Sequence, residues 1–468
     1  MAEYFAQYIS AWIANLTVGL LSSLALLALV LLSACVFIWM ERKVSARIQD
    51  RLGPTRVGGR FGWLQAPADG IKLICKEDII PAEADRLLFR VAPYISFVTM
   101  FAVFMALPWA TDWVPIRLDA AVFFIVAVAG LEVFGVILGG YASGSKWSLY
   151  GSMREAAQVI SYEIPMGLCV VVVVLIAGSM DLVEIGNRQA GWFWNWYLLH
   201  DPFTFVTFWI YITCAVAHTN RAPFDLPEAE SELVAGFMTE YSGFRWAVFF
   251  MAEYGAMLAV SALAAILFLG GWNGPIPIAK VLWLTPETGA VAGFIGNCLG
   301  ACILLFKAYL GVTFMMWLRW TLPRLRIDQV MTTCLKYCLP LVSAMLAGAM
   351  LWTFVLPGGV TGLLFPAESN FQPIEQNSPL GQEGIPLEEN HTDNSRRGMI
   401  ENDTRCDCKL KIVNCKFQIA DISVSLSGEW RVAKPQAAFI SFQQSSFRLP
   451  PSPFHPTPHP SSVVLTQL

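Results

Sequence analysis

Eight long apolar stretches divide the chain, and loops rich in charged or turn-forming residues separate them. They lie at about 14–40, 91–112, 119–141, 157–178, 202–219, 244–269, 288–312 and 337–356. A helix needs about 20 consecutive apolar residues to cross the hydrocarbon core of a bilayer. The pattern therefore predicts an all-α, polytopic membrane protein with eight transmembrane helices.

Composition agrees with a membrane protein and separates a tail from the rest. Hydrophobic residues make up 56% of the chain and charged residues 14%, whereas soluble domains average about 45–50% and about 25%. After Leu356-Pro357-Gly358-Gly359 the chain becomes rich in Pro, Ser, Gln and Asn, with no long apolar run. That composition is typical of disorder. We predict a transmembrane domain over 1–359 and a low-complexity, disordered C-terminal extension over 360–468.

Lys and Arg concentrate in alternate loops. The 41–90 loop holds ten of them, and the loops at 142–156, 220–245 and 313–336 hold eight more. The intervening loops contain only Arg117, Arg188 and Lys280. The positive-inside rule places the basic loops on the cytoplasmic (or matrix) side and both ends of the bundle outside.

Within the first basic loop, residues 63–76 have the pattern of an amphipathic helix. Leu64, Ala68, Ile71 and Cys75 recur at three- and four-residue steps, opposite charged residues. Such a helix can lie in the membrane interface or pack against a partner protein. Both interpretations stay open, and both can hold together.

The loop at 220–245 carries an unusual run of carboxylates between two apolar stretches. They are Asp225, Glu228, Glu230, Glu232 and Glu240. Only Arg221 and Arg245 are basic in this loop. In a soluble protein it would be an ordinary acidic surface loop, but here the topology puts it at the cytoplasmic end of two predicted spans.

Three more carboxylates lie inside predicted spans: Glu132, Glu163 and Glu253, with Glu155 at the mouth of the fourth span. A charged side chain at the bilayer centre costs at least roughly 2.5–3.5 kcal/mol. No Lys or Arg lies within one helical turn of the three along the chain. Each could be neutral and simply hydrogen-bond neighbouring helices. Their number, next to the acidic loop, favours a hydrated proton path instead.

Proline at position 165 adds a local prediction. It has no N–H to offer the carbonyl of Ser161, which leaves an acceptor beside Glu163 that water could fill.

The cysteines do not indicate a metal or redox centre. There are eleven, mostly in apolar stretches, and none forms a tight Cys-x-x-Cys group. Cys406, Cys408 and Cys415 lack an evident fourth ligand. Zinc or an iron–sulfur cluster bound by this chain is therefore not expected, and nothing indicates nucleic acid as a partner.

A series of short motifs follows one another in a fixed order between about Met40 and Leu356. They are Glu41-Arg42-Lys43, Gln49-Asp50-Arg51-Leu52-Gly53-Pro54, Leu64-Gln65 with Ala68-Asp69, Lys76-Glu77-Asp78, Ser148-Leu149-Tyr150-Gly151-Ser152-Met153-Arg154, Ser161-Tyr162-Glu163, Arg221-Ala222-Pro223-Phe224-Asp225-Leu226-Pro227-Glu228-Ala229-Glu230, Glu240-Tyr241-Ser242-Gly243, Gly270-Gly271-Trp272 and Leu322-Pro323-Arg324-Leu325-Arg326-Ile327-Asp328-Gln329. The chain resembles the quinone-site membrane subunit of respiratory complex I, the proton-pumping NADH:quinone oxidoreductase (the H subunit in bacteria, subunit 1 in mitochondria).

The resemblance implies a subunit of an enzyme that binds no redox centre itself. Flavin and iron–sulfur clusters are expected on peripheral-arm partner subunits, with quinone as substrate and antiporter-like membrane subunits and lipid as further partners. The implied acidic path contains Glu132, Glu163, Glu228, Glu230 and Glu253, with Asp225, Glu232 and Glu240 near the quinone chamber. The residues implied at the chamber or the subunit seam are Arg42, Arg51, Asp69, Lys72, Arg221 and Arg324. The headgroup donors belong to a partner.

Two features depart from the family pattern. Thr55 follows Gly-Pro where the family usually has Asn, and a hydroxyl can still cap a turn. The tail after Pro357 is foreign to the family and is either a lineage-specific extension or a mistaken gene end.

Two alternatives remain open from the sequence. One is the related membrane subunit of a proton-translocating hydrogenase, which shares the acidic loop but uses no quinone. The other is a stand-alone secondary transporter, which would usually show internal repeats and broken half-helices. The bacterial plasma (inner) membrane is the expected location, with the mitochondrial inner membrane as the alternative.

Overall fold

In the computed structural model, which describes residues 11–226, 230–277 and 289–356, the regular elements are all helices. The long ones are α2 (Ala11–Ile48), α4 (Arg86–Ala106), α5 (Ala121–Gly130), α6 (Glu132–Ala142), α7 (Lys146–Ala177), α10 (Pro202–His218), α12 (Gly243–Phe268), α14 (Ala290–Thr321) and α16 (Leu339–Val355). The short ones are α3 (Gln65–Cys75), α8 (Leu182–Arg188), η1 (Phe193–Asn195), α9 (Tyr197–His200), α11 (Glu230–Leu233), η2 (Gly236–Met238), α15 (Ile327–Thr332) and the π-helical turn η4 (Thr333–Cys338). The all-α prediction is confirmed.

Seven candidate spans among the described residues are long and apolar enough to cross a membrane. They are α2, α4, the α5–α6 pair, α7, α12, α14 and the α15–α16 rod. The fifth predicted span forms α10, which is apolar but has only 17 residues. At 1.5 Å per residue it is about 25 Å long, slightly less than a typical hydrocarbon core. The eighth crossing therefore stays a prediction.

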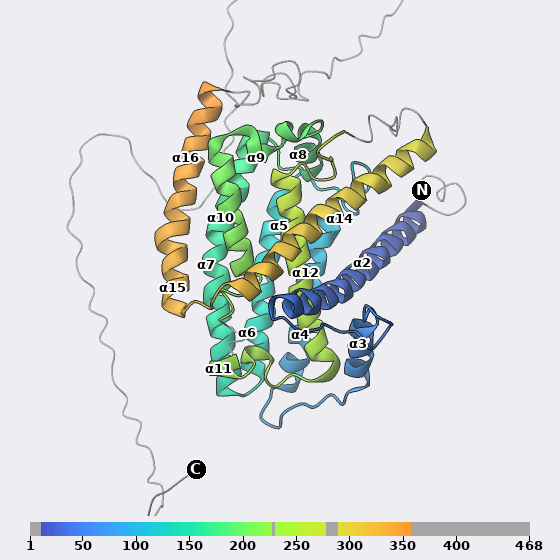
Figure 1. Cartoon of the computed structure of the whole chain (residues 1–468), viewed down its shortest axis with the longest axis vertical. Helices are drawn as coiled ribbons and strands as arrows, with labels where there is room; N and C mark the ends of the chain where they lie inside the picture. Colours follow the sequence, from blue (N-terminus) through green and yellow to red (C-terminus); the bar gives the residue numbers. More distant parts are fainter. Residues whose placement is uncertain (1–10, 227–229, 278–288, 357–468) are drawn as a thin grey trace, which may run out of the picture. The chain divides into compact units, whose positions relative to one another are not determined.

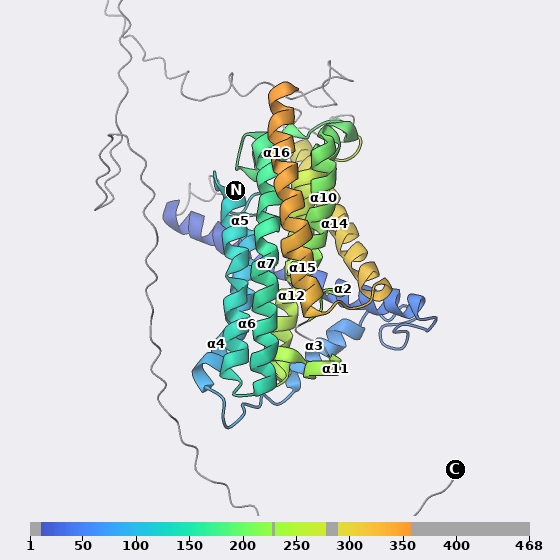
Figure 2. The same ribbon diagram turned by 90° about the vertical axis from the view of Figure 1, so that its left-hand side faces the viewer.

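Helix α12 is the centre of the bundle, with α2, α4, α10 and α14 packed around it (Figure 1). Apart from Arg245 and Glu253 its sequence is almost wholly apolar, and 78% of its most apolar 18-residue stretch is buried. An apolar helix suits either lipid or the bundle interior, and the helices packed around α12 place it in the interior. Figure 2 shows α16 against the outer side of α7 and α10. The side chains of α12 therefore meet those of four other helices.

Small residues let α4, α6 and α7 approach one another closely. A Cβ at Gly135 of α6 would lie 2.2 Å from Ser96 Oγ of α4. A Cβ at Gly140 would lie equally close to Ser152 Oγ of α7. Close backbone approach of this kind is how membrane helices gain packing energy without a hydrophobic driving force. It brings the polar groups of these three helices within reach of one another.

The turns at the lower end of Figure 1 carry α3 and α11. Helix α3 forms where the amphipathic pattern predicted a helix, with Ala66 buried and Ile71 and Ile74 exposed. Whether it lies in a membrane interface stays a prediction. The predicted division at 359/360 and the tail over 360–468 lie outside the described residues.

Candidate functional site

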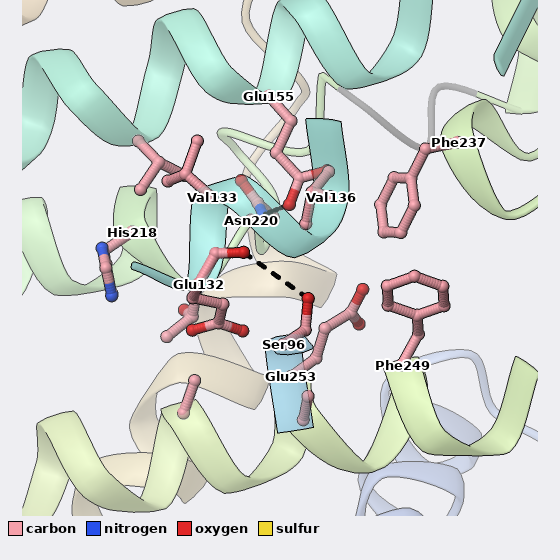
Figure 3. Close-up of a pocket in the computed structure, with 14 residues that line it drawn as sticks. Ser96, Glu132, Val133, Val136, Glu155, His218, Asn220, Phe237, Phe249 and Glu253 are labelled. Carbon is pink, nitrogen blue, oxygen red and sulfur yellow. Dashed lines mark hydrogen bonds between the residues drawn. The ribbon is translucent and has the colours of Figure 1, made fainter. Parts of the chain in front are cut away.

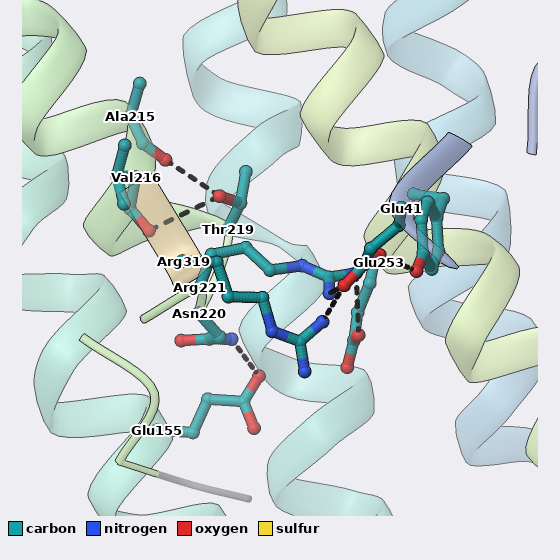
Figure 4. A network of polar contacts seen from close by, with 10 residues as sticks. Glu41, Glu155, Ala215, Val216, Thr219, Asn220, Arg221, Glu253 and Arg319 are labelled. Atoms are coloured by element: carbon teal, nitrogen blue, oxygen red, sulfur yellow. Dashed lines mark hydrogen bonds and ion pairs between the residues drawn. The ribbon is translucent and has the colours of Figure 1, made fainter. Parts of the chain in front are cut away.

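A cluster of buried charges joins α2, α12 and α14 to the end of α10 (Figure 4). It consists of Glu41, Arg221, Glu253, Tyr254 and Arg319, and we call it the buried charge cluster. Glu41 accepts hydrogen bonds from the Tyr254 hydroxyl and the Arg319 guanidinium. Arg221 lies 3.5 Å from Glu41 and 3.9 Å from Glu253. Its guanidinium also covers the Tyr254 ring at 4.6 Å.

The end of α10 explains why Arg221 points inward. Thr219 bonds back to the carbonyls of Ala215 and Val216, and Asn220 takes a left-handed conformation with φ 52°. Asn tolerates this region better than most residues. The chain therefore turns sharply at Asn220 and leaves Arg221 only 6% exposed.

A cavity lies beside this cluster, and we call it the acidic cavity (Figure 3). Three carboxylates line it, each from a different helix: Glu132 of α6, Glu155 of α7 and Glu253 of α12. Ser96 of α4 and His218 of α10 complete its polar lining, together with Thr219 and Asn220. Its volume of about 20 Å³ suits about one water molecule. The site can thus hold a short hydrogen-bonded chain between carboxylates.

The helix is interrupted at Leu131, directly before Glu132. Helix α5 ends at Gly130 and α6 begins at Glu132, with Leu131 bonding to the carbonyl of Val128 in a tighter turn. The Ser96 hydroxyl donates to the Glu132 carbonyl at 3.5 Å, a weak contact. Irregular helix geometry of this type is frequent at functional sites. Glu132, the residue that follows this break, lines the cavity.

Glu155 is buried at the loop-facing side of the acidic cavity. It accepts a hydrogen bond from the Asn220 amide at 2.7 Å. Gln158 donates to the Asn220 side-chain oxygen at 3.0 Å and to the Ala217 carbonyl at 2.8 Å. These contacts fasten the end of α10 to α7. They hold Glu155 in a fixed position at the cavity.

Glu163 does not line the acidic cavity. It is half-buried on α7, against the end of α5, where a Cβ on Gly130 would lie 2.3 Å from its Oε1 atom. The prediction of an open carbonyl at Ser161 is wrong, because the Cys334 thiol donates to that oxygen at 3.0 Å. The contact comes from η4, which lies far away in sequence.

The sequence shows no cation near Glu253, but the fold supplies one. Arg221 is 32 residues earlier in the chain and reaches Glu253 because α10 and α12 are adjacent. The idea of an unneutralised acid group is therefore wrong for this residue. Ion pairing of this kind is usual for charges at bilayer depth.

The acidic loop itself is only partly described. Pro227 to Ala229, and with them Glu228, lie outside the described residues, and for Glu230 only the backbone of α11 is described. Asp225 and Glu240 are half-buried. Glu232 is exposed and pairs with Arg154 at 2.7 Å. The hydrogen bond and charge of Arg154 hold the pKa of the Glu232 carboxyl below its usual range.

Two further groups of predicted residues lie at the lower end of the bundle. Arg324 is exposed and lines a cavity of about 480 Å³ with Arg154, Arg326, Glu232 and Asp328. In the first loop, Arg42 pairs with Asp69 at 2.5 Å, which ties α2 to α3. Lys72 and Arg51 are exposed. The structure thus places these residues apart from the buried charge cluster.

Among the acidic and basic side chains of the site, three are not predicted as functional from the sequence: Glu41, Arg319 and His218. Glu41 appears there only within a motif, and Arg319 only as one of the cations of a basic loop. His218 ends an apolar run directly before the Arg221 motif. This position is the feature of the sequence that could have indicated a functional role for His218. Among the described residues, no group of three or more His, Cys, Asp or Glu could hold a metal ion.

Comparison with known proteins identifies the family. A family model described as NADH dehydrogenase matches residues 21–350. The chain is 44% identical over 346 residues to the H subunit of NADH-quinone oxidoreductase from Anaeromyxobacter dehalogenans (strain 2CP-C), covering 72% of this chain and 83% of the relative. The chain belongs to the H-subunit family of complex I. The H subunit from Geobacillus kaustophilus (strain HTA426) is 44% identical over 341 residues, with 73% and 95% covered.

Membership in the H-subunit family confirms the resemblance seen in the sequence. The chain is a multi-pass membrane subunit of NADH-quinone oxidoreductase, an enzyme complex, and it associates with other complex I subunits. Neither the hydrogenase nor the stand-alone transporter is supported by these relatives. The matched region ends at residue 350, close to the end of α16.

Proposed function

We propose that this subunit begins a proton path for complex I and forms part of its quinone chamber. The observation that supports the path best is the acidic cavity, which gathers Glu132, Glu155 and Glu253 from three helices. Carboxylates at bilayer depth are costly, and they typically mark ion or proton pathways. A cavity of water size between them provides the connection that a proton transfer needs.

The buried charge cluster would link the chamber to this path. Glu253 belongs to both features, because it pairs with Arg221 and lines the acidic cavity. A change of charge at the quinone would shift the equilibrium protonation of nearby carboxylates through this network. Glu253 would pass that change to Glu132, and Glu163 would continue the path on the far side of α5. Asp225, Glu228, Glu230, Glu232 and Glu240 would supply protons from the loop.

The chamber part of the proposal concerns the lower end of the bundle. The Arg42–Asp69 pair fixes α3 beside α2, and Arg51, Lys72 and Arg324 would face the chamber or the seam with the peripheral arm. Peripheral-arm subunits would carry flavin, the iron–sulfur clusters and the quinone-headgroup donors. Antiporter-like membrane subunits would receive the protons. All eight apolar stretches would cross the membrane, with the basic loops on the cytoplasmic side.

The test uses Glu132→Gln and Glu163→Gln in the assembled complex. Each substitution keeps the size of the side chain and replaces its titratable carboxyl group with an amide. We expect unchanged NADH oxidation with a hydrophilic artificial acceptor, but a quinone-linked rate lowered by about tenfold or more. Glu184→Gln is the matched control, because Glu184 lies on α8, pairs with Arg188 four residues later and lines neither the acidic cavity nor the buried charge cluster. Normal quinone-linked rates and proton pumping in both variants would contradict the acidic path.

A further inference from the structure

His218 lies where two cavities of the bundle meet, next to the proposed proton path. It is the last residue of α10 and is 6% exposed. It lines the acidic cavity and also a second cavity of about 30 Å³ that reaches deeper into the bundle. Glu132 lines both cavities too. The second cavity is otherwise mostly apolar, with Met100, Ile125 and Leu263 in its wall.

The Nδ1 atom of His218 is buried and has no hydrogen-bond partner among the described residues. A buried polar atom without a partner is unfavourable, and a water molecule in the adjoining cavity would provide that partner. Figure 3 shows the ring beside Glu132, at the edge of the acidic cavity. A nitrogen that borders a cavity of water size is well placed for exchanging protons through a single water.

The groups around His218 come from several helices. Glu132 faces it from α6, Glu155 from α7 and Glu253 from α12, all across the acidic cavity. Tyr211 lines the second cavity from α10 itself and donates its hydroxyl to the Val260 carbonyl, so it already has an acceptor. Carboxylates therefore form the titratable surroundings of this imidazole.

We propose that His218 is a proton-relay residue between Glu132 and the Glu155 side of the acidic cavity. This inference rests on the proposed proton path and names one of its carriers. A neutral imidazole takes a proton on one ring nitrogen and then releases the proton from the other, so that the ring returns to a neutral form. The step moves one proton and needs no oxidant or reductant.

The test compares His218→Gln with His218→Glu in the assembled complex. Glutamine keeps hydrogen bonding but cannot relay a proton, whereas glutamate restores a titratable group. We expect His218→Gln to lower quinone-linked proton pumping by about tenfold or more, with NADH oxidation by a hydrophilic acceptor and the amount of assembled complex unchanged. His218→Glu should recover most of the pumping. Its pH profile should differ from that of the parent, because a carboxyl group and an imidazole release their protons at different pH.

Thr213→Val is the control on the same helix, since the Thr213 hydroxyl donates to the Trp209 carbonyl and its side chain lines neither cavity. Normal pumping in His218→Gln would overturn the relay, and so would equal losses in the Gln and Glu variants, which indicate a packing role. Glu132→Gln is measured in parallel. If Glu132→Gln loses proton pumping while His218→Gln pumps normally, only the relay is wrong. If both variants pump normally, the whole proton path is wrong.

Discussion

Removing the Arg221 guanidinium should destabilise the bundle strongly. The substitution Arg221→Met keeps much of the side-chain volume but leaves Glu41 and Glu253 without the cation that lies 3.5 Å and 3.9 Å away. At an effective dielectric constant of about 20, each contact corresponds to about 4 kcal/mol of Coulomb attraction. Breaking a buried pair by removing one partner typically costs about 3–5 kcal/mol. We expect the lower end, because Arg319 and Tyr254 still hold Glu41.

The assay is the temperature at which half of the purified complex loses this subunit in mild detergent. A loss of about 3 kcal/mol in a domain of this size should lower that temperature by about 5 °C or more. Arg319→Met is the matched comparison, because its side chain is 28% exposed against 7% for Arg221, and solvent weakens its contribution. Adding Glu253→Gln to Arg221→Met should restore part of the stability, by about 1–2 kcal/mol.

The reasoning about the buried charge cluster would be refuted by two results. One is an Arg221→Met complex as stable as the parent. The other is a larger loss in Arg319→Met than in Arg221→Met.

Two other predictions concern α5, α7 and α11. Gly130→Ala should lower quinone-linked activity, because its new Cβ would lie 2.3 Å from the Glu163 carboxyl and displace it. Gly167→Ala on α7 is the control and should leave the activity unchanged, because its Cβ meets nothing within 4 Å. Equal activities in the two variants would contradict this prediction. Arg154 lowers the pKa of Glu232, so their pairing stabilises the α11 segment. This stabilisation is complete above the ordinary carboxyl pKa and is lost as pH falls through the lowered pKa. The protection factors of the α11 amides, which are corrected for the pH dependence of intrinsic exchange, should therefore fall at acid pH and in high salt, and Arg154→Met should abolish that dependence.

The helices could be predicted from the sequence because long apolar runs determine them. Their ends could not, since α2 and α14 continue beyond the apolar stretches into charged segments, to Ile48 and Thr321. The break at Leu131 was also hidden, because an apolar residue between Gly130 and Glu132 looks like the middle of one helix. Local pattern carries no information on such tertiary effects.

The site was predictable in type rather than in detail. Carboxylates in apolar runs stood out, and two of them, Glu132 and Glu253, share one cavity. The Arg221–Glu253 pair and the contacts of Glu41 depend on which helices are neighbours. The spacing of residues along the sequence does not show which helices are neighbours. The sequence does not single out His218, because one histidine at the end of an apolar run is usually only a packed side chain.

The most direct test of the proton path is a map of the assembled complex in lipid at a resolution that shows ordered water. We expect water in the acidic cavity, hydrogen-bonded in sequence to Glu253, Glu132 and Glu155, and continuous with the lower end of the bundle. A dry cavity, in which apolar side chains separate these three carboxylates from one another, would contradict the proton path.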